Sequence, residues 1–217
     1  RICSLFKKVS EKVDPDAAVV ASAGKASVAK KTAEFNPGFD ELKAIADFAV
    51  ENNIYVISDE IYEKLIYEGE HVSIASFNDK IKDLTIVING VSKTFAMTGW
   101  RIGFAAAPLD IAKAMANVQS HAASNPNSIA QAAALAAVEG GYEEVEEMKR
   151  HFKARCDHMV ERINKIEGVY CKKPQGAFYI MMNISGLIGT ELYGKVIENA
   201  DDFAGLFLDK AKVAVVP

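Results

Sequence analysis

Residues 90–103 read GVSKTFAMTGWRIG and place Lys93 among small, apolar and aromatic neighbours. Burying an ammonium group is costly, so such surroundings favour the neutral amine, which is the form that attacks carbonyl groups. Arg101 follows eight residues later and supplies a planar, permanent cation that suits phosphate. For a lysine and an arginine considered alone, the ordinary interpretation is a surface lysine and a salt-bridged arginine.

Compact apolar runs lie on both sides of this stretch, and they are typical of buried strands: residues 17–20, 54–57, 84–88 and 102–107. Other segments have the helical period of apolar residues, over 2–13, 39–52, from 109 onward, 128–138 and 142–166. Strands that alternate with helices predict an α/β fold, in which ligands collect at the carboxyl ends of the strands. Asp59, Lys93 and the turn at residues 22–27 all follow predicted strands directly.

The last third of the chain predicts a smaller α/β domain. We expect strands at 169–172, 177–183 and 213–216, with helices at 190–198 and 201–210. Gly140-Gly141 interrupts the helical pattern and is the predicted domain boundary. The domains are therefore expected at 1–140, a larger sheet domain, and at 141–217.

Composition excludes several classes of protein. The net charge of −4 gives no basic face for nucleic acid. No apolar run reaches the roughly 18 residues that a membrane span requires. Three distant cysteines without a CxxC pair predict reduced thiols and a cytoplasmic location, and four histidines without ligand spacing predict no metal site. Arg1 is not an initiator residue, so we expect the natural chain to begin upstream.

The whole stretch at 90–103 resembles, position by position, the attachment-site signature of class I/II (aspartate aminotransferase-like) pyridoxal-phosphate (PLP) aminotransferases. These have fold type I, a mixed, mostly parallel sheet in a large domain joined to a smaller α/β domain. The resemblance implies that Lys93 carries PLP as a Schiff base and that Arg101 anchors its phosphate.

A second match lies at Val56-Ile57-Ser58-Asp59-Glu60-Ile61-Tyr62, which resembles the strand-end motif of the same family. The resemblance implies that Asp59 pairs with the pyridinium nitrogen of PLP, which would keep the ring able to accept electrons. It also implies that Tyr62 hydrogen-bonds the phenolic oxygen. Considered alone, Asp59 is equally well a helix N-cap and Tyr62 a core aromatic.

Two weaker matches precede these motifs. Asn36-Pro37-Gly38 resembles the Asn-Pro-Thr-Gly motif without its Thr, so Asn36 would also reach the phenolic oxygen, although the tripeptide alone is a turn. Residues 22–27 read SAGKAS and resemble the turn that binds the phosphate, through Gly24 and Lys25. The spacing excludes a P-loop.

Gly90 stands where some members of the family have a phosphate-binding Ser. Its backbone could serve there, but it offers no hydroxyl. Ser92, the neighbour of Lys93, is the residue whose hydroxyl could compensate.

The implied function is an aminotransferase that moves an amino group between an amino acid and a 2-oxo acid, with Lys93 as the general base. The family resemblance also implies a homodimer with sites at the subunit interface. Two alternatives stay open, because a fold does not fix a function. One is a PLP-dependent C–S lyase of the same fold, and the other is a truncated chain of this fold without catalytic activity.

Family members are nearly twice as long as this chain. The aromatic residue that stacks on the cofactor ring and the Arg that clamps the substrate carboxylate have no counterpart in the sequence. The sequence either joins separate pieces of a longer polypeptide or is a truncated product, and the intact region around Lys93 favours the first. That explanation predicts chain breaks near residues 25–32 and on either side of 36–38. We therefore expect the groups that select the substrate to lie mostly in the missing segments.

Overall fold

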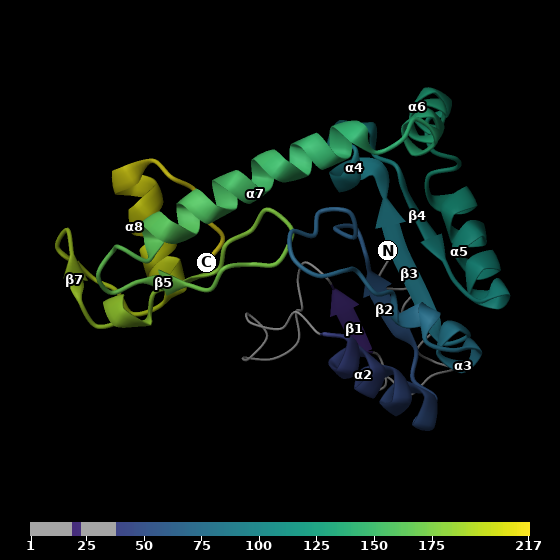
Figure 1. Cartoon of the computed structure of the whole chain (residues 1–217), viewed down its shortest axis with the longest axis horizontal. Helices are drawn as coiled ribbons and strands as arrows, with labels where there is room; N and C mark the ends of the chain where they lie inside the picture. Colours follow the sequence, from purple (N-terminus) through teal and green to yellow (C-terminus); the bar gives the residue numbers. More distant parts are fainter. Residues whose placement is uncertain (1–18, 23–37) are drawn as a thin grey trace. The chain divides into compact units, whose positions relative to one another are not determined.

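The computed structural model describes residues 19–22, as backbone, and residues 38–217 (Figure 1). These residues form two compact units, the first built from 19–22, 38–149 and 175–177, and the second from 150–174 and 178–217. The helix expected at 2–13 and the predicted chain breaks between residues 25 and 38 lie outside the described residues. The assignment of domains to 1–140 and 141–217 stays a prediction.

The first unit is built on a four-stranded sheet with strand order β1-β2-β3-β4 (Figure 1). The strands are β1 (Val19–Ser22), β2 (Val56–Asp59), β3 (Thr85–Gly90) and β4 (Gly103–Ala106). β1, β2 and β3 run parallel, and β4 pairs antiparallel with β3. This mixed, mostly parallel sheet with helical connections confirms the predicted α/β class.

The core of this unit lies between the sheet and the segments that precede β2 and β3. Helix α2 (Phe39–Glu51), the short helix η2 (Ile74–Ser76) and helix α3 (Asp79–Lys82) contribute to it. Ala46 and Ala49 of α2 turn inward and Leu42 and Ile45 pack against this core, whereas Phe48 is 53% exposed. The buried cluster consists of Ala46, Ala49, Ile54, Val56, Ile74 and Ile81. Asn78 begins α3 by accepting the N–H of Ile81 at 3.1 Å.

Three further helices of the chain lie within a few residues of the predicted helical segments: α5 (Leu109–Ala122), α6 (Ser128–Glu139) and α7 (Glu143–Ile163). The short helices α4 (Val91–Thr94) and η3 (Thr98–Trp100) were not predicted. The start of α6 is set by the Asn127 side chain, which accepts the N–H groups of Ile129 and Ala130. Among the described residues, no helix is long and apolar enough to cross a membrane.

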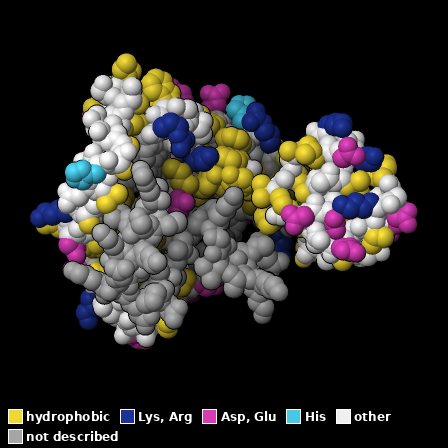
Figure 2. All heavy atoms as spheres, turned by 180° about the vertical axis from the view of Figure 1, so that it is seen from behind, with side chains coloured by type: hydrophobic (Ala, Val, Ile, Leu, Met, Phe, Trp, Pro, Cys, Tyr) yellow, Lys and Arg dark blue, Asp and Glu magenta, His cyan; other side chains and the backbone are white. Residues whose placement is uncertain are grey.

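Several large apolar side chains of the first unit are exposed. Phe104 of β4 is 55% exposed, and Leu109 of α5 and Ile129 of α6 are each 70% exposed. Figure 2 shows hydrophobic side chains at the surface of both units. All four residues of β4 are exposed, and no strand pairs with its free edge within the described part of the chain.

A distant segment also belongs to the first unit. The N–H of Tyr67 donates to the carbonyl of Gln175 at 2.7 Å, and the N–H of Ala177 donates to the carbonyl of Leu65 at 2.8 Å. Ala177 therefore pairs here, and the strand expected at 177–183 is reduced to two residues, Met182–Asn183 (β6).

The second unit contains residues 150–163 of α7, two small antiparallel strand pairs, the short helix η4 and helix α8. The elements after α7 are β5 (Tyr170–Cys171), β6, η4 (Ser185–Leu187), β7 (Glu191–Leu192), β8 (Lys195–Val196) and α8 (Ala200–Ala211). The prediction of a helix at 190–198 is wrong. Tyr193 and Gly194 have φ angles of 53° and 78°, so they form a tight turn that joins β7 to β8.

The strand predicted at 213–216 is also wrong. These residues follow α8, which ends at Lys212 in the left-handed conformation with φ of 58°. Val213 is 44% exposed and Val216 is 78% exposed, and no strand lies beside them within the described residues. An apolar run of this length becomes a strand only where a partner strand is present.

Candidate cofactor site

The predicted site residues that the structure describes gather at one edge of the sheet because of strand direction. β1, β2 and β3 are parallel, so their carboxyl ends lie at the same edge, where Ser22 pairs with Asp59 and Asp59 with Ile88. β4 is antiparallel, so its first residue, Gly103, pairs with Gly90 at the end of β3. The segment from 91 to 102 therefore leaves the sheet and returns to it at this edge.

Lys93 lies in the single turn of α4, directly after β3, and its side chain is partly buried. Its Nζ atom is 6.0 Å from the centroid of the Tyr62 ring, an arrangement in which the cation faces the aromatic ring. Tyr62 is 6% exposed. The structure thus brings together two residues that the sequence places 31 positions apart. Ser92, the other predicted residue of α4, is also partly buried.

Asp59 ends β2 and is partly buried. Its Oδ1 atom accepts the N–H of Ile61 at 3.2 Å, so the carboxylate stabilises the turn that follows the strand. The alternative interpretation of Asp59 as a helix N-cap is wrong, because a turn and not a helix follows β2. The hydrogen bond to Ile61 also fixes the start of the segment that carries Tyr62.

Arg101 lies between η3 and β4 in the left-handed conformation, with φ of 57° and ψ of 43°. A side chain other than Gly is rare in this region and is strained there. The side chain is exposed, and its Nη1 atom donates to the carbonyl of Thr98 at 2.9 Å. The guanidinium group therefore has further donors available at the edge where β3 ends.

Gly90 is required by the close approach of β3 and β4. A Cβ atom at this position would lie 2.9 Å from the carbonyl oxygen of Ile102 and 3.0 Å from the Cα of Gly103. Both contacts are with backbone atoms that cannot rotate away. A Ser at position 90 does not fit this backbone without a shift, so only the main chain of Gly90 can contribute to an anion site.

Three predicted site residues, Asn36, Gly24 and Lys25, lie outside the described residues. The predicted roles of all the site residues toward a cofactor stay predictions.

A buried carboxylate beside this edge was not singled out from the sequence. Glu60 is 4% exposed, and its Oε1 atom accepts hydrogen bonds from Ser58 Oγ at 3.0 Å and Ser73 Oγ at 2.6 Å. Its Oε2 atom lies 3.0 Å from His71 Nε2. Burial, the largest single effect, acts to raise the pKa of Glu60, but the hydrogen bonds and the His71 charge together hold this pKa below its usual value.

Glu63 also approaches this group, and one potential ligand atom from each of Glu60, Glu63 and His71 lies within 4.8 Å of the others. Both oxygens of Glu60 already have partners in the protein. The sequence gives little indication of this cluster, because Glu60 and His71 lie 11 positions apart and match no metal-binding spacing.

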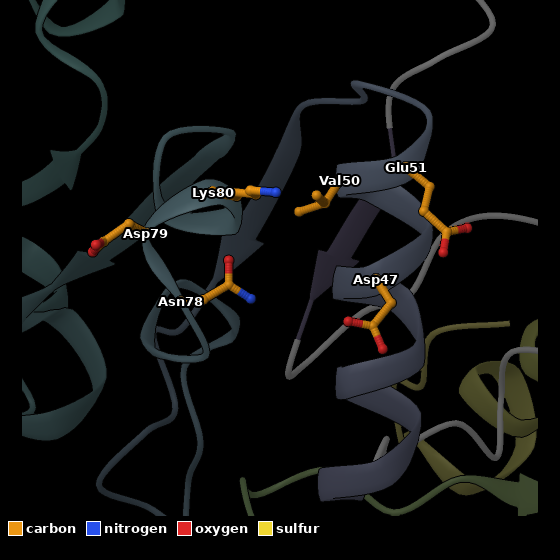
Figure 3. A pocket seen from close by; sticks show the side chains of 6 residues that line it. All are labelled: Asp47, Val50, Glu51, Asn78, Asp79 and Lys80. Atoms are coloured by element: carbon orange, nitrogen blue, oxygen red, sulfur yellow. The ribbon is translucent and has the colours of Figure 1, made fainter.

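The first unit has hollows, of which two are candidates for a site. One has a volume of about 560 Å³ and lies between α2 and α3 (Figure 3). These helices lead into the starts of β2 and β3, whereas Lys93 follows the end of β3. Asn78 and Lys80 point toward α2 in this view, whereas Glu51 and Asp79 point away from the gap. The other has a volume of about 370 Å³ and lies beside the segment 94–97 that follows Lys93, facing the end of α6 and the start of α7. Only the second adjoins the predicted site.

The sequence is similar to that of known enzymes over most of its length. Residues 36–217 match the model of the family described as aminotransferase class I and II. The chain is 46% identical over 179 residues to an aspartate aminotransferase from Bacillus sp. (strain YM-2), covering 82% of this chain and 45% of that protein. The chain thus spans about half the length of the curated relatives that it matches.

Solved structures share the fold. An aspartate aminotransferase from Rhizobium meliloti superposes with a TM-score of 0.83 and 34% identity, covering 97% of this chain and 52% of that one. An aromatic aminotransferase from Pyrococcus horikoshii has a TM-score of 0.78 and 37% identity, covering 100% and 54%. These findings confirm the expected fold type I architecture. The chain belongs to the aminotransferase class I and II family.

Proposed function

We propose that this chain forms the cofactor-binding part of a PLP-dependent aminotransferase that exchanges amino groups between an amino acid and a 2-oxo acid. The observation that carries the proposal is the position of Lys93. Its amine faces the Tyr62 ring at 6.0 Å, at the sheet edge where Asp59 ends the neighbouring strand.

The chemistry of these side chains fits PLP. The cofactor has an aldehyde, a phenolic oxygen, a ring nitrogen and a phosphate, which call for an amine, a hydrogen-bond donor, a carboxylate and a cation respectively. Lys93, Tyr62, Asp59 and Arg101 supply these four groups from one edge of the sheet. Asn36, Gly24, Lys25 and Ser92 are proposed to complete the contacts.

Each residue has a distinct proposed role. When bound, PLP supplies an electron-accepting ring that withdraws the electron pair left on the substrate Cα. Lys93 holds the cofactor covalently and, once released, its Nζ atom takes the proton from the substrate Cα. Asp59 keeps a negative charge beside the ring nitrogen, and Arg101 holds the phosphate through its planar group of donors. Tyr62 donates a hydrogen bond to the phenolic oxygen.

We also propose that the whole protein works as a homodimer in the cytoplasm. The exposed apolar residues of β4, α5 and α6 support the proposal that further protein packs against the first unit. Patches of this kind are typical of faces that another subunit or another segment covers. The choice of a dimer rests on the family.

Spectroscopy and covalent trapping test the proposal directly. The protein is incubated with PLP and should develop an absorbance band at roughly 400 nm, which borohydride reduction should convert into a stable mass increase on the peptide that contains Lys93. The Lys93→Ala variant should lose both signals and all amino-group transfer. The Lys113→Ala variant, which changes an exposed lysine of α5, serves as the matched control and should keep them.

The products distinguish this function from the alternatives. Transfer that depends on an added 2-oxo acid supports the aminotransferase, whereas release of pyruvate and ammonia without one supports a C–S lyase. PLP binding without either reaction supports a non-catalytic chain. Turnover by the Lys93→Ala variant would contradict the role of Lys93 in each case.

A further inference from the structure

Glu60 forms a buried polar group that the proposed chemistry does not use. Its side chain is almost fully covered, yet it carries a carboxylate whose two oxygens have three partners, Ser58, Ser73 and His71. Burying a charge without such partners is costly, and hydrogen bonds to a charged group are short and directional. These three partners therefore fix the position of the Glu60 side chain more strictly than apolar packing would.

The position of Glu60 in the chain links it to the candidate site. It lies directly after Asp59 and two residues before Tyr62, and its N–H continues the β2–β3 ladder by donating to the carbonyl of Ile88 at 2.8 Å. Side chains alternate along a strand, so Ser58 and Glu60 share one face while Asp59 lies on the other. The Ser58–Glu60 hydrogen bond is consistent with this alternation.

The backbone around Glu60 is held on both sides. The Ile61 N–H donates to Asp59, and the Glu63 N–H donates to the Glu60 carbonyl at 3.0 Å. Ser73 and His71 belong to a segment that is separate in sequence and leads into the buried Ile74. The carboxylate of Glu60 thus connects the end of β2 to a part of the core that carries no candidate site residue.

We propose that Glu60 is a positioning residue: its carboxylate fastens the 59–62 segment to residues 71–73 and so holds Asp59 and Tyr62 in place at the cofactor site. The expected effect on cofactor binding rests on the proposed function, but the contacts of Glu60 with residues 71–73 are present in the protein without cofactor. Glu60 touches neither substrate nor cofactor and acts through its neighbours.

Hydrogen exchange in the cofactor-free protein tests the positioning itself. Glu60→Gln keeps the size of the side chain but removes the charge, so the N–H groups of Glu60 and Ile61 should exchange about tenfold faster. Thr85→Val is the matched control, because Thr85 is equally buried and its hydroxyl donates to Ile81 at 2.7 Å, at the other end of the sheet. It should not accelerate exchange at residues 60 and 61 selectively.

The holoenzyme gives the second readout. Glu60→Gln should weaken PLP binding about tenfold and alter the absorbance band of the bound cofactor, while Thr85→Val leaves both unchanged at a similar loss of stability. Ser73→Ala, which removes one donor and leaves Glu60 in place, should act in the same direction with a smaller effect if Glu60→Gln fails to fold. Glu60→Asp, which keeps the carboxylate, should retain part of the PLP affinity that Glu60→Gln loses.

The outcomes are distinguishable. Uniformly faster exchange throughout the first unit, or equal effects of Glu60→Gln and Thr85→Val on PLP binding, would show a general stabilising role and overturn the proposal. If the unmodified protein does not bind PLP, the proposed function fails. The exchange rates at residues 60 and 61 still decide whether Glu60 holds the segment.

Discussion

The Nζ atom of Lys93 lies 6.0 Å from the centroid of the Tyr62 ring, although the two residues come from different strand ends. Lys93 follows β3 and Tyr62 follows β2, and the parallel pairing of these strands brings the two ends together. The approach of Lys93 to Tyr62 depends on strand pairing and not on a local turn. A substitution of either side chain can therefore be tested while the backbone that brings them together is kept.

Tyr62→Phe should keep the fold and lower the rate of amino-group transfer. The ring, which is nearly buried, would still pack beside Lys93, but the hydroxyl proposed to reach the cofactor would be lost. We expect kcat to fall about tenfold, in line with the loss of one hydrogen bond to a charged group. Tyr62→Ala should instead cost about 3–5 kcal/mol of stability, because it leaves a cavity. Steady-state kinetics and urea unfolding separate the two effects.

Arg101→Gly should separate stability from cofactor binding. Glycine adopts the left-handed conformation of this position without strain, so the free energy of unfolding should stay unchanged or rise by about 1 kcal/mol. Loss of the guanidinium group should weaken PLP binding at least tenfold. The measurements are thermal unfolding without cofactor and a PLP titration followed by absorbance. Unchanged PLP affinity would remove Arg101 from the site.

Gly90→Ala should destabilise the sheet edge. The added Cβ would meet the backbone of Ile102 and Gly103 at 2.9 and 3.0 Å, so β3 and β4 must move apart at a cost of about 1–3 kcal/mol. Gly99→Ala is the matched control, because no atom lies within 4 Å of the position that its Cβ would occupy. Equal melting temperatures of the two variants would contradict this account of the close approach.

Acid should destabilise the first unit partly through Glu60. Folding lowers the pKa of this carboxyl below its ordinary value of 4.5, because the bonds from His71 and Ser73, the His71 charge and the Ser58 bond outweigh the effect of burial. The folded protein therefore binds fewer protons than the unfolded chain. The contribution of Glu60 to stability is complete above about pH 4.5 and is lost as the pH falls through the lowered pKa of its carboxyl. Urea unfolding between pH 7 and pH 3 should show a smaller loss for Glu60→Gln.

Tyr193→Asn should stabilise the second unit. Tyr193 is 80% exposed and has a φ of 53°, a conformation that Asn tolerates better than Tyr in a two-residue hairpin turn. We expect a gain of about 0.5 kcal/mol, measured as a higher urea midpoint at an unchanged slope. Gly194→Ala, at a φ of 78°, should have the opposite sign.

The periodic elements of this fold were predictable from local sequence. Helices α2, α6 and α7 and strands β2 and β3 lie within a few residues of their predicted positions, because long amphipathic and apolar patterns commit a segment to one conformation. Where a segment depended on a single turn or on a partner strand, prediction failed. Tyr193-Gly194 reverses the chain inside the expected helix, and the valines at 213–216 have no strand to pair with among the described residues.

The sequence alone determined that this is an α/β chain, and it carries Lys93, Asp59, Tyr62 and Arg101 in motifs that resemble those of class I/II aminotransferases, because motifs and periodic patterns consist of neighbouring residues. Only the tertiary structure placed Tyr62 against Lys93, required a glycine at position 90 and joined Glu60 to His71 and Ser73. Those contacts join segments that are distant in the chain. Strand order and register, which no local pattern encodes, decide whether such segments meet.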